Sequence, residues 1–232
     1  MPSLILIPGL LCDQRLWSAQ IAGLGDCADV AVADIAQQTT IEEMAAGILA
    51  NSPSRFSLAG FSLGSQVALE IVSIARERVD RLALLSATRG GLLPVTAVAI
   101  RRAIAKIEAG GFEEYLDEAF PTYFAASGSD LDRCKRIFVE MAHTIGEPAG
   151  LRQMRALLAI AGPFSELKRI QCPTLVVGGR EDRRTTPEAH RQLSSAIPGS
   201  ELLLIEGAAH FTPLEKPTEV TLAHRRWLSA PA

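Results

Sequence analysis

Cysteine is scarce and scattered in this chain of 232 residues. The four cysteines show no C-x-x-C spacing: Cys12, Cys27, Cys134 and Cys172. Metal centres and disulfide frameworks both depend on closely spaced or regularly paired cysteines. The pattern therefore argues against a bound metal and against a disulfide scaffold. We expect buried free thiols in a reducing cytoplasm, and no cofactor.

Long apolar runs are also missing. The apolar stretch Leu4–Ile7 near the amino terminus has no basic residue ahead of it. A membrane-spanning helix needs about 20 apolar residues and the core of a signal peptide about 7–15, so this stretch is too short for either. We therefore expect a cytoplasmic protein that does not enter a membrane.

Positive charge is not in excess, because 23 Lys and Arg residues face 26 Asp and Glu residues, a net charge of −3. Surfaces that bind nucleic acids or anionic membranes need clustered positive charge. The pairs Arg101-Arg102 and Arg225-Arg226 fit solvated helix faces better than such a patch. The expected partner is a small-molecule substrate, with no nucleic acid and no membrane. A homodimer stays open.

What the chain does contain is a series of short apolar runs bounded by turn residues, with helical patterns between them. The runs predict strands at Leu4–Ile7, Val30–Ala33, Phe56–Ala59, Leu82–Ser86, Leu175–Val177 and Leu202–Ile205. Helices are expected at Leu16–Ala22, Ile41–Ala50, Ser65–Glu77, Pro187–Ala196 and Pro217–Leu228. Continuous rather than alternating hydrophobicity indicates strands covered on both faces, as in a parallel sheet. The alternation predicts an open α/β fold.

The alternation breaks once, because no strand is predicted between Ser86 and Leu175. Helical spacing marks Val95–Glu108, Phe112–Phe120, Asp130–Thr144 and Gly150–Ala161, separated by breaks at residues 110–111, 127–129 and 146–148. A single crossover connection needs only about a dozen residues. We interpret residues 89–165 as a helical cap over the carboxyl edge of the sheet, and residues 1–88 and 166–232 as the core.

The segment Gly60-Phe61-Ser62-Leu63-Gly64 has the pattern G-x-S-x-G between a predicted strand and a predicted helix. This context is typical of a nucleophile elbow, a strained turn that presents a serine hydroxyl above the sheet. Glycine is needed on both sides because a Cβ there would collide with its neighbours. Ser62 is therefore the candidate nucleophile.

A serine hydroxyl becomes an effective nucleophile when a base removes its proton, so the site needs a histidine and an orienting carboxylate. His210 follows the predicted strand Leu202–Ile205 in a loop of small residues, at the sheet edge where chemistry takes place in open parallel sheets. The remaining histidines are expected to be structural or solvated: His143, His190 and His224.

The orienting carboxylate is expected after the predicted strand Leu175–Val177, where a glycine turn leads into Glu181-Asp182. Either side chain could orient His210, and Asp182 is the better candidate. A tetrahedral intermediate also needs donors for its oxyanion. The turn Pro8-Gly9 follows the first strand, so we assign the backbone amides of Leu10 and Leu63, each worth typically about 10²–10³ in rate.

Together these segments resemble the α/β-hydrolase superfamily, in its branch of serine esterases and C–C bond hydrolases. The resemblance covers nearly the whole chain and is carried by Ile7–Leu10, the elbow around Ser62, Gly179–Asp182 with Pro187 after it, and Gly207–Pro217. It implies Asp182 as the acid, His210 as the base, and a helical cap that shapes an apolar pocket. A serine nucleophile argues against dehalogenases and epoxide hydrolases, which are similar but need aspartate there.

The chain departs from the family pattern at two places. Pro8 stands where the family often has histidine, and the first strand matches the one that is usually third, without the hairpin ahead of it. We therefore expect a reduced α/β-hydrolase fold, with a mostly parallel sheet of about six strands, helices on both faces and the cap after the fourth strand.

The expected activity is hydrolysis of a small to medium, largely apolar ester or thioester through an acyl-enzyme. C–C bond hydrolysis by the same machinery is an alternative. A non-catalytic small-molecule receptor is the alternative from another class, because a fold does not define a function. Candidate pocket walls are Phe61, Met154, Leu157, Phe164 and Phe211.

Overall fold

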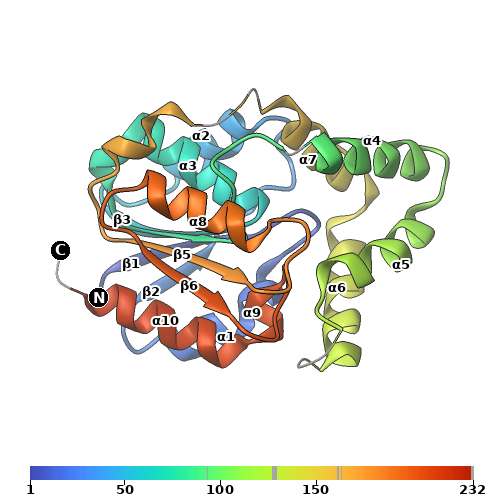
Figure 1. Cartoon of the computed structure of the whole chain (residues 1–232). Coiled ribbons are helices and arrows are strands. Elements are labelled where there is room, and N and C mark those ends of the chain that lie inside the picture. Colours follow the sequence, from blue (N-terminus) through green and yellow to red (C-terminus); the bar gives the residue numbers. More distant parts are fainter. Residues whose placement is uncertain (93, 127–129, 161, 163, 231–232) are drawn as a thin grey trace.

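The computed structural model describes residues 1–92, 94–126, 130–160, 162 and 164–230. At its centre lies a six-stranded sheet in the order β2-β1-β3-β4-β5-β6 (Figure 1). The strands are β1 (Ser3–Ile7), β2 (Asp29–Val32), β3 (Phe56–Phe61), β4 (Val79–Leu85), β5 (Thr174–Gly179) and β6 (Glu201–Ile205). Each neighbouring pair is parallel. The predicted parallel sheet is confirmed.

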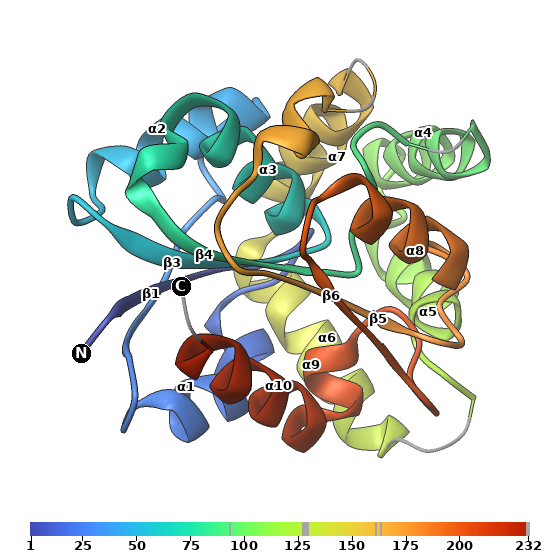
Figure 2. The same ribbon diagram turned by 60° about the vertical axis from the view of Figure 1, so that its left-hand side comes forward.

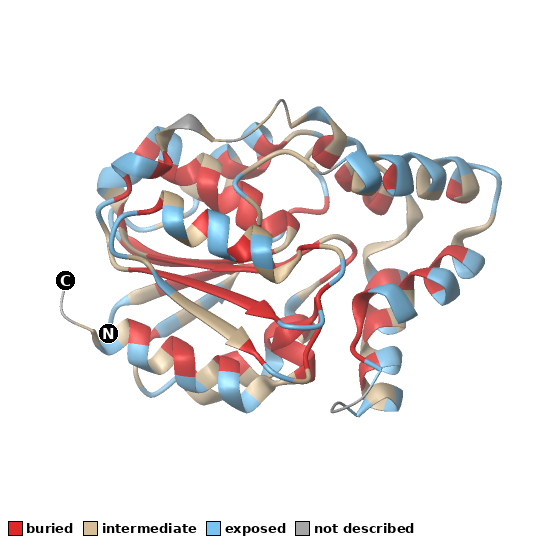
Figure 3. Cartoon of the chain, viewed as in Figure 1, coloured by how far each residue is buried: buried red, intermediate tan, exposed pale blue. Residues whose placement is uncertain are grey.

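Burial differs between the inner strands and the edge strands of the sheet. Every residue of β3 and β5 is buried, and both strands lie inside the sheet, as the red arrows of Figure 3 show. The edge strands β2 and β6 are half-exposed over most of their length. Cover on both faces accounts for the apolar runs of the inner strands, whereas the edge strand β6 has a similar run, Leu202–Ile205, with its leucines only half-buried.

Helices cover both faces of the sheet, as Figures 1 and 2 show from two directions. One face carries α2 (Ile41–Ala50), α3 (Leu63–Ala75) and α8 (Pro187–Ala196), and the other carries α1 (Ser18–Leu24), α9 (Thr212–Glu215) and α10 (Pro217–Ser229). Short 3-10 helices lie at Gln14–Trp17, Arg76–Arg78 and Ser165–Arg169. Thr186 caps α8, because its hydroxyl accepts the N–H of Ala189 at 3.3 Å.

The four helices expected between β4 and β5 are present, and they extend to one side of the sheet (Figure 1). We call them the cap helices: α4 (Pro94–Glu108), α5 (Phe112–Tyr123), α6 (Leu131–Ile145) and α7 (Glu147–Ala159). The helix α7 begins ahead of its predicted start because Pro148 belongs to its first turn, where a proline is tolerated. The predicted end at Ala161 and the predicted break at 127–129 lie outside the described residues.

The cysteines are unpaired thiols; Cys12 and Cys134 are buried, whereas Cys27 and Cys172 are half-buried. Burial raises the pKa of Cys12 far above its ordinary value and that of Cys134 to about 11. Both thiols are therefore protonated at neutral pH. In the part of the chain that the structure describes, no helix is long and apolar enough to cross a membrane.

Two of the histidines are structural and buried. His190 and His224 are each 0% exposed, and burial lowers the pKa of each to about 4. His224 packs between Trp17 and Trp227, with ring centroids 6.1 and 5.8 Å away. His143, in contrast, is exposed and lies 2.9 Å from the carboxylate of Glu113.

These two imidazoles make stability depend on pH. Their folded pKa values lie below the unfolded value of 6.5, so their contribution is fully present above pH 6.5 and is lost as the pH falls toward 4. Each should lower the free energy of unfolding by about 3 kcal/mol over that range. We expect His224→Leu to reduce the slope of the unfolding free energy against pH, measured by urea unfolding between pH 4.5 and 7.

Equal slopes for His224→Leu and the wild type would show that His224 does not carry the effect.

Candidate active site

The chain turns sharply between β3 and α3. Ser62 joins the two elements and has a φ of 52°, in the left-handed region that is strained for any residue other than glycine. Its N–H donates to the carbonyl of Leu85 at 2.8 Å, and its own carbonyl accepts the N–H of Ser65 at 3.0 Å. The strained turn is therefore held by β4 on one side and by α3 on the other.

The flanking glycines make room for this turn. A Cβ at Gly60 would lie 2.3 Å from the carbonyl oxygen of Gly64, and a Cβ at Gly64 would lie 2.3 Å from that of Ile7. The first turn of α3 thus packs backbone to backbone against β1 and β3. No other residue type fits either position without moving a strand or the helix.

Three side chains from distant parts of the chain meet at this turn. The Nε2 atom of His210 lies 3.0 Å from the hydroxyl of Ser62, and its Nδ1 atom lies 2.8 Å from Oδ2 of Asp182. His210 and Asp182 are only 4% and 2% exposed. Glu181, the alternative acid, is exposed. The structure therefore brings Ser62, His210 and Asp182 together and leaves Glu181 outside.

The carboxylate of Asp182 is stabilised in its charged form. Its Oδ1 atom accepts the N–H groups of Arg184 at 2.8 Å and Thr185 at 2.9 Å. Burial acts to raise the pKa of Asp182, but the neighbouring His210 and these hydrogen bonds outweigh it, so the pKa lies below its ordinary value. At neutral pH, the ionised carboxylate can accept the Nδ1–H of His210 and so orient the ring.

The main chain around His210 is held from several elements. Its N–H donates to the carbonyl of Tyr123 at 2.9 Å, and the hydroxyl of Ser86 donates to its carbonyl at 2.6 Å. The aromatic ring of Phe61 packs against the imidazole, with centroids 5.4 Å apart. The imidazole is therefore fixed by β3, by the loop after β4 and by the end of α5.

The two amides expected to bind an oxyanion lie at the same place. Leu10, after β1, and Leu63, the first residue of α3, both line the cavity that contains Ser62. Neither N–H donates a hydrogen bond to any acceptor of the described residues. The first N–H groups of a helix have no partner within the helix, which leaves that of Leu63 available.

Two polar residues that support this site escaped the sequence analysis. Gln153, on the cap helix α7, is 0% exposed; its side-chain oxygen accepts the N–H of Leu11 at 2.9 Å and its amide donates to the carbonyl of Ile35 at 3.3 Å. It braces the loop that contains Leu10. A signal was available, because Gln153 lies at helical spacing from Gly150 and Leu157 on the buried face of α7.

The second is Glu215, which is 4% exposed. Its carboxylate accepts the N–H of Ala209 at 3.0 Å and that of Ala125 at 2.8 Å, so it joins the loop of His210 to the segment after α5. Burial raises the pKa of Glu215 above its ordinary value. Its place in the closing segment Gly207–Pro217 was the only sequence signal.

A cavity of about 70 Å³ opens beside the hydroxyl of Ser62. Phe61, Leu157 and Phe211 line it, as the sequence analysis expected. The same cavity is lined by residues that the sequence did not single out, among them Ile100, Tyr123 and Arg184. Aliphatic and aromatic side chains therefore form much of its wall, and Arg184 adds a charge.

Two of the expected wall residues, Met154 and Phe164, line other cavities. Met154, on α7, lines an adjoining cavity together with residues of α4 and α5. Phe164 lines a cavity with Leu69 and Val72, in the second half of α3. Both residues are apolar and near the cap, but the packing of the helices directs their side chains away from the Ser62 cavity.

The described residues contain no group of three His, Cys, Asp or Glu side chains arranged to hold a metal ion. A hydroxyl bonded to an imidazole that is bonded to a buried carboxylate is the arrangement of a nucleophile with its general base.

Comparison with known proteins agrees with this geometry. The family model described as "Alpha/beta hydrolase family" matches residues 4–223, and the chain belongs to this family. It is a hydrolase of that fold, as the named relatives below also indicate.

The proposed carbamate hydrolase RutD of Klebsiella pneumoniae is 27% identical over 228 residues, with 90% of this chain and 84% of that protein covered. The pimeloyl-[acyl-carrier protein] methyl ester esterase of Nitrosomonas europaea is 24% identical over 217 residues, with 88% and 81% covered. Among solved structures, a thermophilic esterase from Thermogutta terrifontis superposes with a TM-score of 0.87 at 25% identity, covering 98% of this chain and 89% of that one.

The turn at Ser62 allows a direct test of its packing. We expect Gly64→Ala to lower the free energy of unfolding by about 3 kcal/mol or more, because the new Cβ would overlap backbone atoms of β1. Gly47→Ala is the matched control: its Cβ would meet only the end of Gln38, at 3.6 Å, and should stabilise α2 by about 0.5–1 kcal/mol. Urea unfolding measures both. Wild-type stability in Gly64→Ala would contradict the packing argument.

Proposed function

We propose that the chain is a serine hydrolase that cleaves a small to medium, largely apolar ester or thioester through an acyl-enzyme. The observation that carries the proposal is the continuous chain of hydrogen bonds from the hydroxyl of Ser62 through His210 to Asp182, at 3.0 and 2.8 Å. Ser62 lies in a strained turn that exposes its hydroxyl to a cavity.

In the first half of the proposed reaction, Nε2 of His210 accepts the proton of Ser62 while Oγ attacks the carbonyl carbon of the substrate. The backbone amides of Leu10 and Leu63 donate to the oxyanion of the tetrahedral intermediate. The intermediate collapses, the bond to the leaving alcohol or thiol breaks, and His210 passes the proton to that leaving group. The acyl group remains as an ester on Ser62.

In the second half, water attacks the acyl-enzyme. His210 accepts a proton from the water and returns it to Oγ of Ser62 as the acid leaves. Asp182 remains ionised throughout and stabilises the imidazolium that forms twice in each cycle. The carboxylate is suited to this role because it is buried and its pKa is below the ordinary value.

The lining of the cavity supports a substrate with an apolar part, because Leu63, Ile100 and Leu157 are among its wall residues. Two similar proteins, the methyl ester esterase and the thermophilic esterase, are named as esterases, which supports an ester bond as the target. The proposed carbamate hydrolase is named for a related carbonyl group. Attack of a serine on a carbonyl carbon would serve each of these bonds.

The first test is hydrolysis of p-nitrophenyl esters of increasing acyl length by the wild type, Ser62→Ala and His210→Ala. Each substitution should lower kcat by about 10⁴–10⁶, because the groups act as a unit. A fluorophosphonate probe should label Ser62 in the wild type and should not label Ser62→Ala.

Turnover retained by Ser62→Ala would eliminate the serine mechanism. Labelling without turnover would keep the activated serine and move the search to thioesters and C–C bonds. Neither labelling nor turnover would favour a small-molecule receptor on the same fold.

A second test separates the two acids. Asp182→Asn should lower kcat by about 10⁴ with the fold retained, because the amide would favour the wrong tautomer of His210. Glu181→Gln is the matched control, since its side chain is exposed, and should keep wild-type kcat. Greater damage from Glu181→Gln than from Asp182→Asn would assign the acid to Glu181.

A further inference from the structure

Arg184 places a full positive charge on the wall of the Ser62 cavity. No Asp or Glu is among the residues that line this cavity in the described part of the chain. The guanidinium charge of Arg184 therefore has no compensating carboxylate on the cavity wall. An apolar ester gives no reason for such a group, because a half-buried cation is stabilised by an anion and not by a hydrocarbon.

The position of Arg184 is fixed. Its backbone N–H donates to Asp182, and its guanidinium carbon lies 4.1 Å from the centre of the Tyr123 ring. One guanidinium nitrogen donates to the hydroxyl of Thr122 at 3.2 Å. A guanidinium carries five N–H donors, so further donors remain for a ligand. A stacked, oriented guanidinium suits a planar carboxylate.

Arg184 also has no partner of its own. Several other arginines of the described residues form ion pairs, for example Arg155 with Glu108 at 2.5 Å and Arg225 with Asp26 at 2.5 Å. No carboxylate of the described residues lies within ion-pair distance of Arg184. An arginine held in place beside a cavity, yet unpaired, is available to an anionic ligand.

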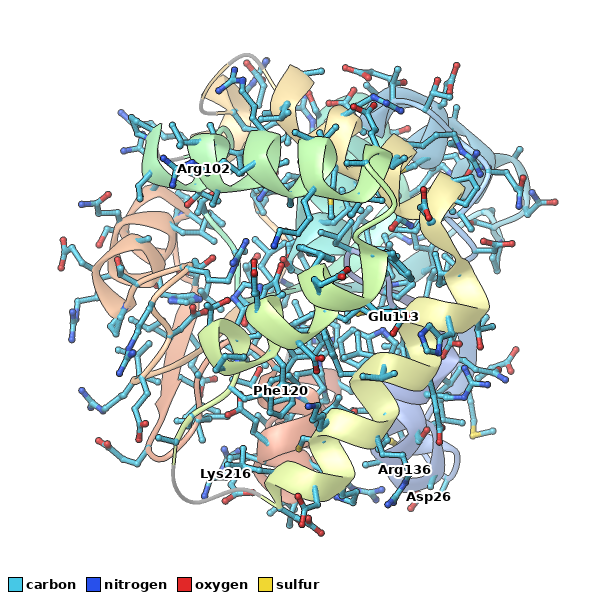
Figure 4. The ribbon with its side chains drawn as sticks, turned by 90° about the vertical axis from the view of Figure 1, so that its right-hand side faces the viewer. Asp26, Arg102, Glu113, Phe120, Arg136 and Lys216 are labelled. Carbon is cyan, nitrogen blue, oxygen red and sulfur yellow. The ribbon has the colours of Figure 1, made fainter. Side chains whose placement is uncertain are left out.

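A second cavity, which adjoins the Ser62 cavity, is also lined by basic side chains. It measures about 220 Å³ and shares Leu10, Ile100 and Arg184 with the Ser62 cavity. Arg102 and Lys106 of α4 line it as well. Its one acidic wall residue, Glu118, is paired with Lys106 at 2.6 Å. Figure 4 shows Arg102 on α4, on the side of the molecule formed by the cap helices. Two unpaired arginines therefore line this route away from Ser62.

We propose that the substrate is an ester that carries a carboxylate, and that Arg184 binds this carboxylate while the scissile carbonyl lies at Ser62. Arg102 adds positive charge further along the adjoining cavity. The inference rests on the proposed ester hydrolase and deepens it, because it defines the substrate as an apolar body with an anionic end. The carboxylate can belong to the acyl part or to the alcohol part.

The experiment compares each anionic ester with a neutral ester of similar length. For the acyl part, the pair is mono-p-nitrophenyl glutarate and p-nitrophenyl valerate. For the alcohol part, the pair is 4-acetoxybutanoate and butyl acetate, followed by pH-stat titration. We expect the wild type to prefer the anionic ester in one pair by about tenfold or more in kcat/KM.

Arg184→Gln should reduce this anionic-to-neutral ratio by about tenfold to a hundredfold, and added salt should reduce the wild-type ratio as well. Arg183→Gln is the matched control, because Arg183 is exposed and adjacent, and it should keep the wild-type ratio. If neither pair shows a preference, or if the ratio is the same in Arg184→Gln, the carboxylate site is overturned. Turnover that Ser62→Ala abolishes, together with an unchanged ratio in Arg184→Gln, would overturn this inference and leave the proposed function intact.

Direct binding separates the inference from the proposed function. Monomethyl glutarate is titrated calorimetrically into the wild type and into Arg184→Gln. Binding that weakens about tenfold or more in the variant supports the carboxylate site even if no ester is turned over. Equal binding, or none to the wild type, overturns it.

Discussion

The close approach of α3 to β1 and β3 is the constraint on which the rest of the site depends. At Gly60 and Gly64 the backbones come within distances that no Cβ tolerates. That approach forces Ser62 into its left-handed conformation and directs its hydroxyl out of the turn. It also brings the first N–H of α3 to the same cavity as the loop after β1, so that nucleophile and amide donors share one location.

The cap helices do more than cover this edge of the sheet. Gln153 of α7 holds the N–H of Leu11, and the carbonyl of Tyr123, at the end of α5, holds the N–H of His210. Glu215 reaches in the other direction and accepts the N–H of Ala125. These contacts are buried and directional, so displacing the cap would leave polar groups unpaired. The loop after β1 and the loop of His210 are therefore held in place by the cap helices.

Charge is distributed unevenly in the site. Asp182 is buried and keeps its negative charge because an imidazole and two backbone N–H groups surround it. One of those N–H groups belongs to Arg184, whose side chain turns toward the cavity. A single short loop thus holds the acid that orients His210 and a cation that faces the substrate.

The sequence by itself determined the parallel sheet, the elbow at Ser62 and the positions of Asp182 and His210 at strand ends. These features follow from local patterns: continuous apolar runs, glycine spacing and small-residue loops. Only the tertiary structure decided that Asp182 rather than Glu181 meets His210 and that Met154 and Phe164 line other cavities. It also decided that Gln153 binds the loop after β1 and that Arg184 lines the Ser62 cavity. The direction of a side chain on a cap helix or loop depends on which distant segment packs against it, and spacing along one chain segment does not contain that information.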